Sequence, residues 1–182
     1  MDETKKSAKV LVVMGSDSDL KVTEPASAIL DRLGIPYEFR VASAHRTPEM
    51  AVALAREAAR SGVAVIIAVA GGAAHLAGVM ASQTLLPVLG VPVAATPLGG
   101  IDAMFATAQM PKGIPVGCMA VGGTANAALL AARIIAINDE NVRNRLEQWQ
   151  KELRQKVRDA DVRVQALFNN SAESDPGGAG AD

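Results

Sequence analysis

The chain has 182 residues, of which 49% are hydrophobic and 20% are charged, so it can bury one sizeable core and is predicted to form a single domain. Its formal net charge is −1, which excludes the overall basic field that attracts nucleic acid or anionic membranes. No apolar run reaches the roughly 18 residues of a membrane span, and the first residues lack the apolar segment of a signal peptide. We therefore expect a cytoplasmic protein with no nucleic-acid and no membrane partner.

The composition also argues against several kinds of bound group. The single cysteine, Cys118, excludes an intramolecular disulfide and is interpreted as a small core residue in a reducing compartment. Aromatic side chains form only 3% of the chain, which is few for stacking a flavin. The glycine-rich dinucleotide fingerprint and the phosphate loop are absent, and no cluster of His, Cys, Asp and Glu has metal-ligand spacing. We expect neither a cofactor nor a metal.

Residues 10–14 form a β-branched apolar run that is followed by the polar turn 15–19, a pattern typical of a strand, a turn and a helix start. The helix is predicted to end at Gly34, and Pro25 is expected to bend or restart it because proline lacks a backbone N–H. Residues 35–42 are predicted to form the second strand.

Thr47 and Pro48 then have the pattern of an N-cap followed by proline at the first helical position, and this helix should end near residues 61–62. The unbroken apolar run 63–70 is typical of a central parallel strand that is covered on both faces. A short helix is predicted over residues 74–82.

Two further strands are predicted at 91–96 and 115–121, and two helices at 101–109 and 125–137. Alternation of strand and helix repeated about five times indicates a three-layer α/β fold with a doubly wound parallel five-stranded sheet. We expect the flavodoxin-like strand order 2-1-3-4-5, which places ligands at the carboxyl ends of the strands.

The composition changes after residue 138, where charged residues alternate with spaced apolar ones. Residues 139–167 are predicted to form a long amphipathic helix whose apolar stripe packs on its own sheet or on a neighbouring subunit. The chain is therefore divided into a flexible N-terminus at 1–8, a catalytic domain at 9–168 and a disordered tail at 169–182.

The polar turn after the first strand is a candidate anion site, because it combines backbone N–H groups, two hydroxyls and a helix N-terminus. Its carboxylates, Asp17 and Asp19, would repel a bare phosphate. One of them is expected to cap the helix, while the other accepts hydrogen bonds from sugar hydroxyls. Any turn rich in Ser and Asp at a helix start has the same pattern, so a simple capping turn is an equal alternative.

The chain's two histidines, His45 and His75, both follow strand-like runs. Imidazole has an ordinary pKa of about 6.5 and can donate or accept a proton near neutral pH. Arg46, next to His45, has the forked donor geometry that suits phosphate, although it could also be a solvated loop charge. His75 could contact a substrate carboxylate or cap the short helix that follows it.

Five segments in register resemble the class I 5-(carboxyamino)imidazole ribonucleotide mutases of purine biosynthesis, and the similarity spans about residues 10–150. These segments are Met-Gly-Ser-Asp-Ser-Asp at 14–19, Ser-Ala-His-Arg-Thr-Pro at 43–48, Ala-Gly-Gly-Ala-Ala-His-Leu at 70–76, Pro-Val-Leu-Gly-Val-Pro at 87–92 and Gln-Met-Pro-Lys-Gly-Ile-Pro-Val at 109–116.

The resemblance implies a homo-octameric enzyme that moves a carboxylate from the exocyclic amine of a ribonucleotide to carbon 4 of its imidazole ring, without cofactor or metal. It implies that His45 is the catalytic acid and base. The implied substrate-binding and site-lining residues are Ser16, Ser18, Asp19, Ser43, Arg46, Gly71, Ala73, Ala74 and His75.

Two positions depart from the family pattern. Leu20 stands where many members have tryptophan, and Ala77 stands where proline is common. The class II relatives, which use carbon dioxide directly, typically carry Ser-Ala-His-Lys, so Arg46 favours class I. A carboxylase that uses carbon dioxide directly, a flavin-binding or signalling module and a structural oligomer with a degenerate site remain as alternatives.

Overall fold

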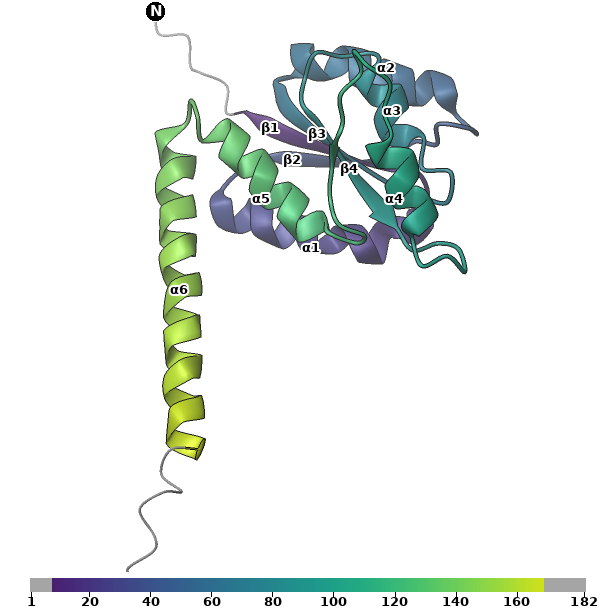
Figure 1. Cartoon of the computed structure of the whole chain (residues 1–182). Helices are drawn as coiled ribbons and strands as arrows, with labels where there is room; N and C mark the ends of the chain where they lie inside the picture. The colour runs from purple at the N-terminus through teal and green to yellow at the C-terminus, as the bar shows by residue number, and fades with distance from the viewer. Residues whose placement is uncertain (1–7, 169–182) are drawn as a thin grey trace, which may run out of the picture. The chain divides into compact units, whose positions relative to one another are not determined.

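In a computed structural model that describes residues 8–168, five parallel strands form one sheet in the order β2-β1-β3-β4-β5. Figure 1 labels the first four of these strands in the chain, β1 to β4. This order confirms the flavodoxin-like prediction. The strands are β1 (Lys9–Met14), β2 (Tyr37–Val41), β3 (Val63–Gly71), β4 (Val88–Val93) and β5 (Gly117–Cys118).

Helices cover both faces of this sheet (Figure 1). Helices α1 and α5 pack against each other on one face, where the Thr124 hydroxyl donates a hydrogen bond of 2.6 Å to the Val22 carbonyl. The other three short helices cover the opposite face. The bounds are α1 (Leu20–Leu33), α2 (Pro48–Ala58), α3 (Leu76–Ala81), α4 (Ile101–Ala108) and α5 (Thr124–Ile135), with single turns of 3₁₀ helix at η1 (Asp17–Asp19) and η2 (Ala59–Ser61).

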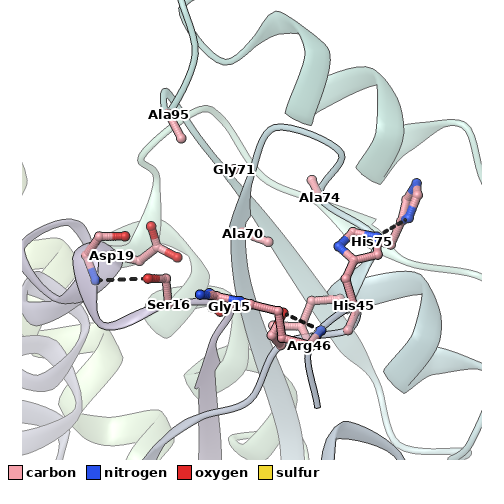
Figure 2. A pocket seen from close by; sticks show the side chains of 14 residues that line it. Gly15, Ser16, Asp19, His45, Arg46, Ala70, Gly71, Ala74, His75 and Ala95 are labelled. Carbon is pink, nitrogen blue, oxygen red and sulfur yellow. Dashed lines mark hydrogen bonds between the residues drawn. The ribbon is translucent and has the colours of Figure 1, made fainter. Parts of the chain in front are cut away.

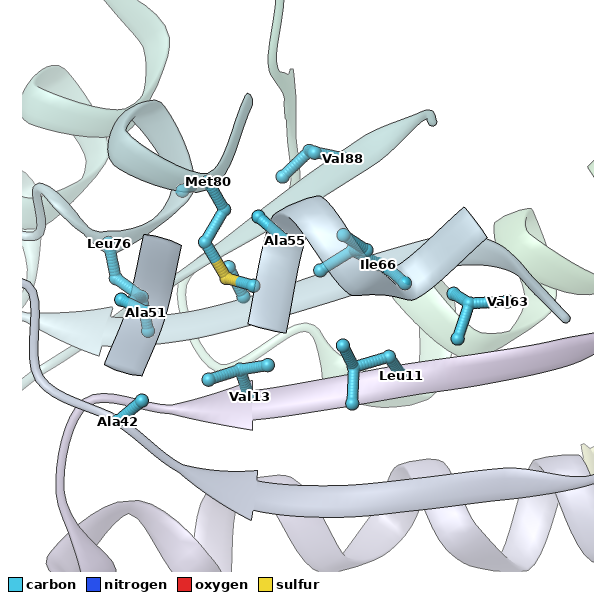
Figure 3. Close-up of a cluster of buried hydrophobic side chains, with 13 residues drawn as sticks. Leu11, Val13, Ala42, Ala51, Ala55, Val63, Ile66, Leu76, Met80 and Val88 are labelled. Carbon is cyan, nitrogen blue, oxygen red and sulfur yellow. The ribbon is translucent and has the colours of Figure 1, made fainter. Parts of the chain in front are cut away.

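The core beneath α2 and α3 consists of branched side chains from the sheet and small side chains from α2 (Figure 3). Ile66 and Met80 are fully buried here, and the alanines at 51 and 55 present the buried face of α2. Because alanine has a short side chain, α2 can lie close to the sheet without leaving a void. This packing fixes the start of α2, and therefore the loop that precedes it.

Three predicted elements differ from the observed ones. Helix α1 continues through Pro25 without the expected restart and ends at Leu33, where Gly34 forms the C-cap with a left-handed φ of 62°. Strand β4 runs from Val88 to Val93, three residues earlier at each end than the predicted 91–96, so residues 94–96 belong to a loop. Strand β5 has only two residues. After Cys118 the hydrogen bonds to β4 no longer follow the regular parallel pattern, and Pro92 has no N–H with which to continue the ladder.

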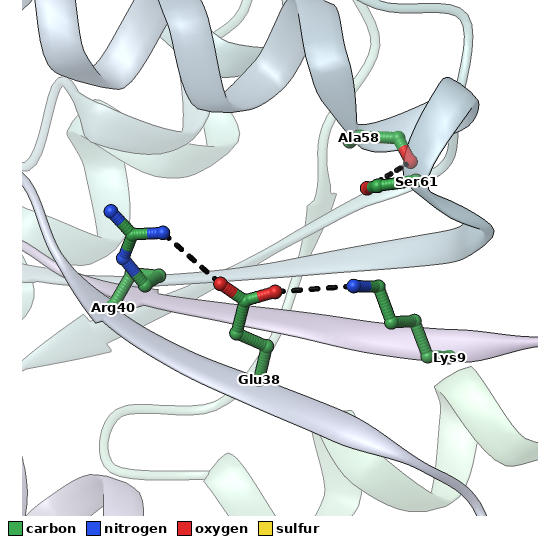
Figure 4. A network of polar contacts seen from close by, with 5 residues as sticks. All are labelled: Lys9, Glu38, Arg40, Ala58 and Ser61. Carbon is green, nitrogen blue, oxygen red and sulfur yellow. Dashed lines mark hydrogen bonds and ion pairs between the residues drawn. The ribbon is translucent and has the colours of Figure 1, made fainter.

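A polar network joins the edge strand β2 to β1 (Figure 4). The Glu38 carboxylate accepts hydrogen bonds from Arg40 at 3.0 Å and Lys9 at 3.1 Å, and these bonds lower its pKa. Exposed ion pairs of this kind add little stability.

The chain divides into two compact units at residues 143 and 144. In the first, Arg143 donates to the Ala136 carbonyl at 2.9 Å and so caps the end of α5. The second contains most of the predicted long helix, observed as α6 (Glu140–Phe168), on which Leu153, Val157 and Val162 are exposed. The predicted tail at 169–182 and residues 1–7 of the predicted flexible N-terminus lie outside the described residues.

Candidate functional site

A pocket of about 360 Å³ opens beyond the carboxyl ends of β1, β2, β3 and β4 (Figure 2). This is the position at which open parallel sheets bind ligands. Three loops supply most of its wall. The lining residues are Gly15, Ser16, Ser18, Asp19, Ser43, Ala44, His45, Arg46, Ala70, Gly71, Ala74, His75, Leu76 and Ala95.

The first loop follows β1 and forms the turn η1. Its N-cap is Ser16, whose hydroxyl accepts a hydrogen bond from the Ser18 N–H at 3.3 Å. Asp17 accepts from the Ser16 hydroxyl at 3.1 Å, and Asp19 makes no side-chain cap. The prediction that an aspartate caps this helix is therefore wrong. The chain first makes a 3₁₀ turn, and the free N–H at its start, that of Ser18, is bonded by the Ser16 side chain.

Asp19 is a buried carboxylate on the wall of this pocket, with 6% of its surface exposed. Burial raises its pKa, while hydrogen bonds from Ser16 and Ser18 and the positive charge of Arg46 oppose that rise. A buried carboxylate with unused oxygen lone pairs is an acceptor for hydroxyl groups. The position therefore suits a sugar hydroxyl rather than a phosphate.

The second loop, residues 43–47, follows the edge strand β2 and is closed by its own polar groups. The Thr47 hydroxyl accepts from the Ser43 N–H at 2.9 Å and donates to the Ser43 carbonyl at 3.3 Å. Thr47 stands at the predicted N-cap position of α2, but its hydroxyl closes the loop instead of capping the helix. The Ser43 hydroxyl accepts from the Arg46 N–H at 3.1 Å.

Arg46 connects this loop to the first one, because its guanidinium donates to the Gly15 carbonyl at 3.2 Å. The side chain is otherwise exposed at the pocket wall. Most of its five N–H donors remain available, so it can hold an anion such as a phosphate.

The third loop, residues 71–75, follows the central strand β3 and is shaped by small residues. Gly72 has a φ of 61° and Ala74 a φ of 42°, which is unfavourable for a residue with a side chain. A Cβ atom on Gly71 would lie 2.5 Å from the Ala95 Cβ. The turn therefore packs directly against the loop after β4, and only glycine fits at Gly71.

The two histidines meet across the pocket rim. The His45 Nε2 and His75 Nδ1 atoms are 2.8 Å apart and share a hydrogen bond, and the rings meet edge to face (Figure 2). His75 makes no side-chain cap of α3, so the structure does not support the capping alternative. The sequence placed both histidines at this edge, but no local pattern indicated that they bond to each other.

Nine of the ten predicted site residues line the pocket, whereas Ala73 is exposed and lies outside its wall. Ala95 is a lining residue that the sequence interpretation missed, because strand β4 was predicted to continue through it. The signal that identifies it is its place beyond the carboxyl end of a parallel strand. Cys118 lies away from the pocket and is half-buried, which raises the pKa of its thiol.

Within residues 8–168, no three His, Cys, Asp or Glu side chains form a group that could hold a metal ion. None of the helices in that part of the chain combines the length with the apolar composition that a membrane-spanning segment requires.

A family model described as AIR carboxylase matches residues 9–156. The chain is 47% identical to the N5-carboxyaminoimidazole ribonucleotide mutase of Pyrococcus horikoshii over 89% of this chain and 93% of that protein. It is 51% identical to the Haemophilus influenzae protein of the same name, over 80% of this chain and 90% of that one. The chloroplastic phosphoribosylaminoimidazole carboxylase of Vigna aconitifolia is 47% identical over 80% of this chain, but only 26% of its own length is matched.

Among solved structures, a point variant of Treponema denticola PurE2 superposes with a TM-score of 0.80 and 27% identity, covering 87% of this chain and 98% of the other. Treponema denticola PurE superposes with a TM-score of 0.76 and 28% identity, over 87% and 99%.

Proposed function

Because this chain belongs to the AIR carboxylase family, we propose that it is a mutase that converts 5-(carboxyamino)imidazole ribonucleotide to 4-carboxy-5-aminoimidazole ribonucleotide in purine biosynthesis. The observation that carries the proposal is a single pocket that joins His45, a proton donor and acceptor, to Arg46 and the hydrogen-bonding groups of Ser16 and Asp19. The names of the bacterial and archaeal relatives support the same reaction.

The nucleotide part of the substrate is bound by the first two loops. Arg46 receives the phosphate through its free guanidinium N–H groups. The Ser16 hydroxyl donates to Asp17 in this structure and would turn from that carboxylate to donate to the phosphate. Asp19 accepts hydrogen bonds from the ribose hydroxyls. The remaining proposed residues that line the site around the base and its carboxylate are Ser18, Ser43, Gly71, Ala74 and His75. Ala73 belongs to the same turn but lies outside the pocket wall.

His45 acts as both acid and base. Loss of carbon dioxide from the carbamate would leave a poor nitrogen anion, so protonation of that nitrogen by the His45 imidazolium lowers the barrier. The freed aminoimidazole then attacks carbon dioxide through carbon 4, and the neutral imidazole removes the proton from that carbon. His45 returns to its starting state, and no external acid or base is consumed.

The carbon dioxide must stay beside the ring until carbon 4 captures it. Correct placement of two reactants can lower the activation free energy by about 7 kcal/mol or more. The small wall of Ala70, Gly71 and Ala74 suits a linear, uncharged molecule. No cofactor or metal takes part in the proposed reaction.

The alternative within this family is a carboxylase that takes carbon dioxide from solution, and the name of the plant relative favours it. Turnover in labelled bicarbonate separates the two reactions. A mutase gives product with little label, whereas a carboxylase gives product labelled at the ratio of the solution.

We extend the proposal to a cytoplasmic homo-octamer in which α6 contacts neighbouring subunits. Apolar side chains exposed on α4 and α6, including Phe105, Ile101 and Val157, support assembly. Light scattering of the purified full chain measures the mass. A mass other than that of eight subunits would contradict this part of the proposal.

The function is tested by an ultraviolet assay of the purified protein with 5-(carboxyamino)imidazole ribonucleotide, followed by the same assay on His45→Asn. The variant should bind the ribonucleotide with a Kd within about threefold of wild type but lose about 10²- to 10⁴-fold in kcat, because it has no titratable group at the reacting atoms. Comparable kcat in the two proteins would remove the acid and base role.

A further inference from the structure

We infer that His75 is a positioning residue that fixes the tautomer of His45 and leaves the His45 Nδ1 atom as the proton acceptor and donor for the substrate. The inference deepens the proposed function and rests on it only for its catalytic consequence. The observation that carries it is the 2.8 Å hydrogen bond between His45 Nε2 and His75 Nδ1.

A hydrogen bond between two imidazole nitrogens requires one proton between them. If His75 donated it, a neutral His45 would carry its own proton on Nδ1, and neither of its nitrogens could accept another. If His45 donates it, Nδ1 of the neutral ring has a free lone pair. Only the second arrangement gives His45 a basic atom that can accept the proton from carbon 4.

The second arrangement also survives a full catalytic cycle. When His45 is an imidazolium, Nδ1 carries the proton that goes to the substrate nitrogen, and Nε2 still donates to His75. After the transfer, the Nε2–H bond to His75 is unchanged and Nδ1 is free to take the ring proton. His75 therefore remains a neutral acceptor throughout, and every proton enters and leaves through one atom of His45.

The geometry of the rim agrees with this division of roles. In Figure 2, the His45 ring lies between His75 and the part of the pocket formed by Gly15, Ser16 and Asp19. Within the described residues, no protein group hydrogen-bonds to His45 Nδ1 or to His75 Nε2. The Nδ1 atom is therefore free for a ligand, and its tautomer depends on the bond at Nε2.

Nuclear magnetic resonance of the ¹⁵N-labelled full chain tests the tautomer without substrate or turnover. The chain has only two histidines, so the spectrum of His45→Asn assigns both rings. We expect neutral His45 in the wild type to be protonated on Nε2, with the nitrogen shifts of a single tautomer. In His75→Ala, both nitrogens of His45 should move toward intermediate shifts, as a mixture of tautomers requires.

A matched variant separates acceptance of the hydrogen bond from the presence of a second titratable ring. The Oδ1 atom of His75→Asn can take the place of Nδ1 as an acceptor, so this variant should keep the single tautomer and recover most of the kcat that His75→Ala loses. In His75→Ala we expect kcat to fall about 10- to 100-fold with less than about threefold change in KM.

Two results would overturn the inference: His45 protonated on Nδ1 in the neutral wild type, or identical His45 nitrogen shifts in the wild type and His75→Ala. If the wild type did not convert the ribonucleotide, the proposed function would fail, while the tautomer measurement would still decide the role of His75.

Discussion

The two loops that carry the histidines are held in place by opposite means. The loop at 43–47 is fixed by side-chain hydrogen bonds between Ser43 and Thr47, whereas the turn at 71–75 is fixed by small residues that let the backbone pack closely against Ala95. The first loop follows an edge strand and the second follows the central strand of the sheet. Polar closure suits a loop in contact with solvent, and close packing suits a turn over the core. The hydrogen bond between His45 and His75 joins the two.

The largest effect is expected in the loop at 43–47, where removal of the Arg46 side chain should weaken substrate binding. Arg46→Ala should raise KM about 10- to 100-fold with a small change in kcat, because charged hydrogen bonds contribute about 1.5–3 kcal/mol each and a ground-state phosphate contact supplies uniform binding. Steady-state kinetics measure both constants. Arg46→Lys is the control, because it keeps the positive charge but loses the forked N–H donors. Its KM should lie between those of the wild type and Arg46→Ala. A loss confined to kcat would contradict the phosphate role.

The close packing of the turn at 71–75 is disrupted most directly by a substitution at Gly71. In Gly71→Ala, the new Cβ would meet the Ala95 Cβ, and displacement of the turn should cost about 1–3 kcal/mol of unfolding free energy. Urea unfolding measures the loss. The double variant with Ala95→Gly removes the nearest opposing atom and should recover part of the lost unfolding free energy, while the Val93 carbonyl oxygen still lies 3.1 Å from the new Cβ. Equal losses in the single and double variants would show that the contact with Ala95 is not what requires glycine.

The closure of the loop at 43–47 by side-chain hydrogen bonds is tested at Thr47. Thr47→Val keeps the shape of the side chain but removes the hydroxyl that bonds both the Ser43 N–H and its carbonyl. We expect a loss of about 0.5–1.5 kcal/mol in unfolding free energy and a lower kcat, because the loop no longer holds His45 in place. Thr47→Ser retains the hydroxyl and serves as the matched control. Unchanged stability and kcat in Thr47→Val would assign closure of the loop to its backbone alone.

The smallest expected effect concerns Asp19. Burial raises the pKa of this carboxyl group in the folded protein, so its ionised form destabilises the fold at pH values above that pKa, and the penalty disappears as the pH falls below the ordinary value. Asp19→Asn should therefore raise Tm by about 1–2 °C at neutral pH, with a difference that shrinks toward acid, while substrate binding weakens. Calorimetry at several pH values checks the sign. A Tm difference that grows toward acid would contradict it.

Local signals in the sequence were enough to predict the order of the strands and the edge of the sheet at which the site lies. The apolar run of β3 and the polar residues that follow β1 and β2 identify this edge, because the carboxyl ends of all the parallel strands lie there. Local patterns failed where neighbouring polar groups compete for the same hydrogen-bond partner. Ser16 rather than an aspartate caps the first turn, and Thr47 bonds Ser43 rather than the helix that it precedes.

The sequence by itself determined the kind of protein: a parallel α/β sheet with a histidine, an arginine and a carboxylate after its strands. The tertiary structure alone decided how these groups act together. It set His45 Nε2 against His75 Nδ1, buried Asp19 beside the charge of Arg46, and brought Ala95 onto Gly71. Periodicity and turn residues report only on neighbours in the chain, whereas a hydrogen bond across 30 residues of sequence depends on the twist and register of the whole sheet.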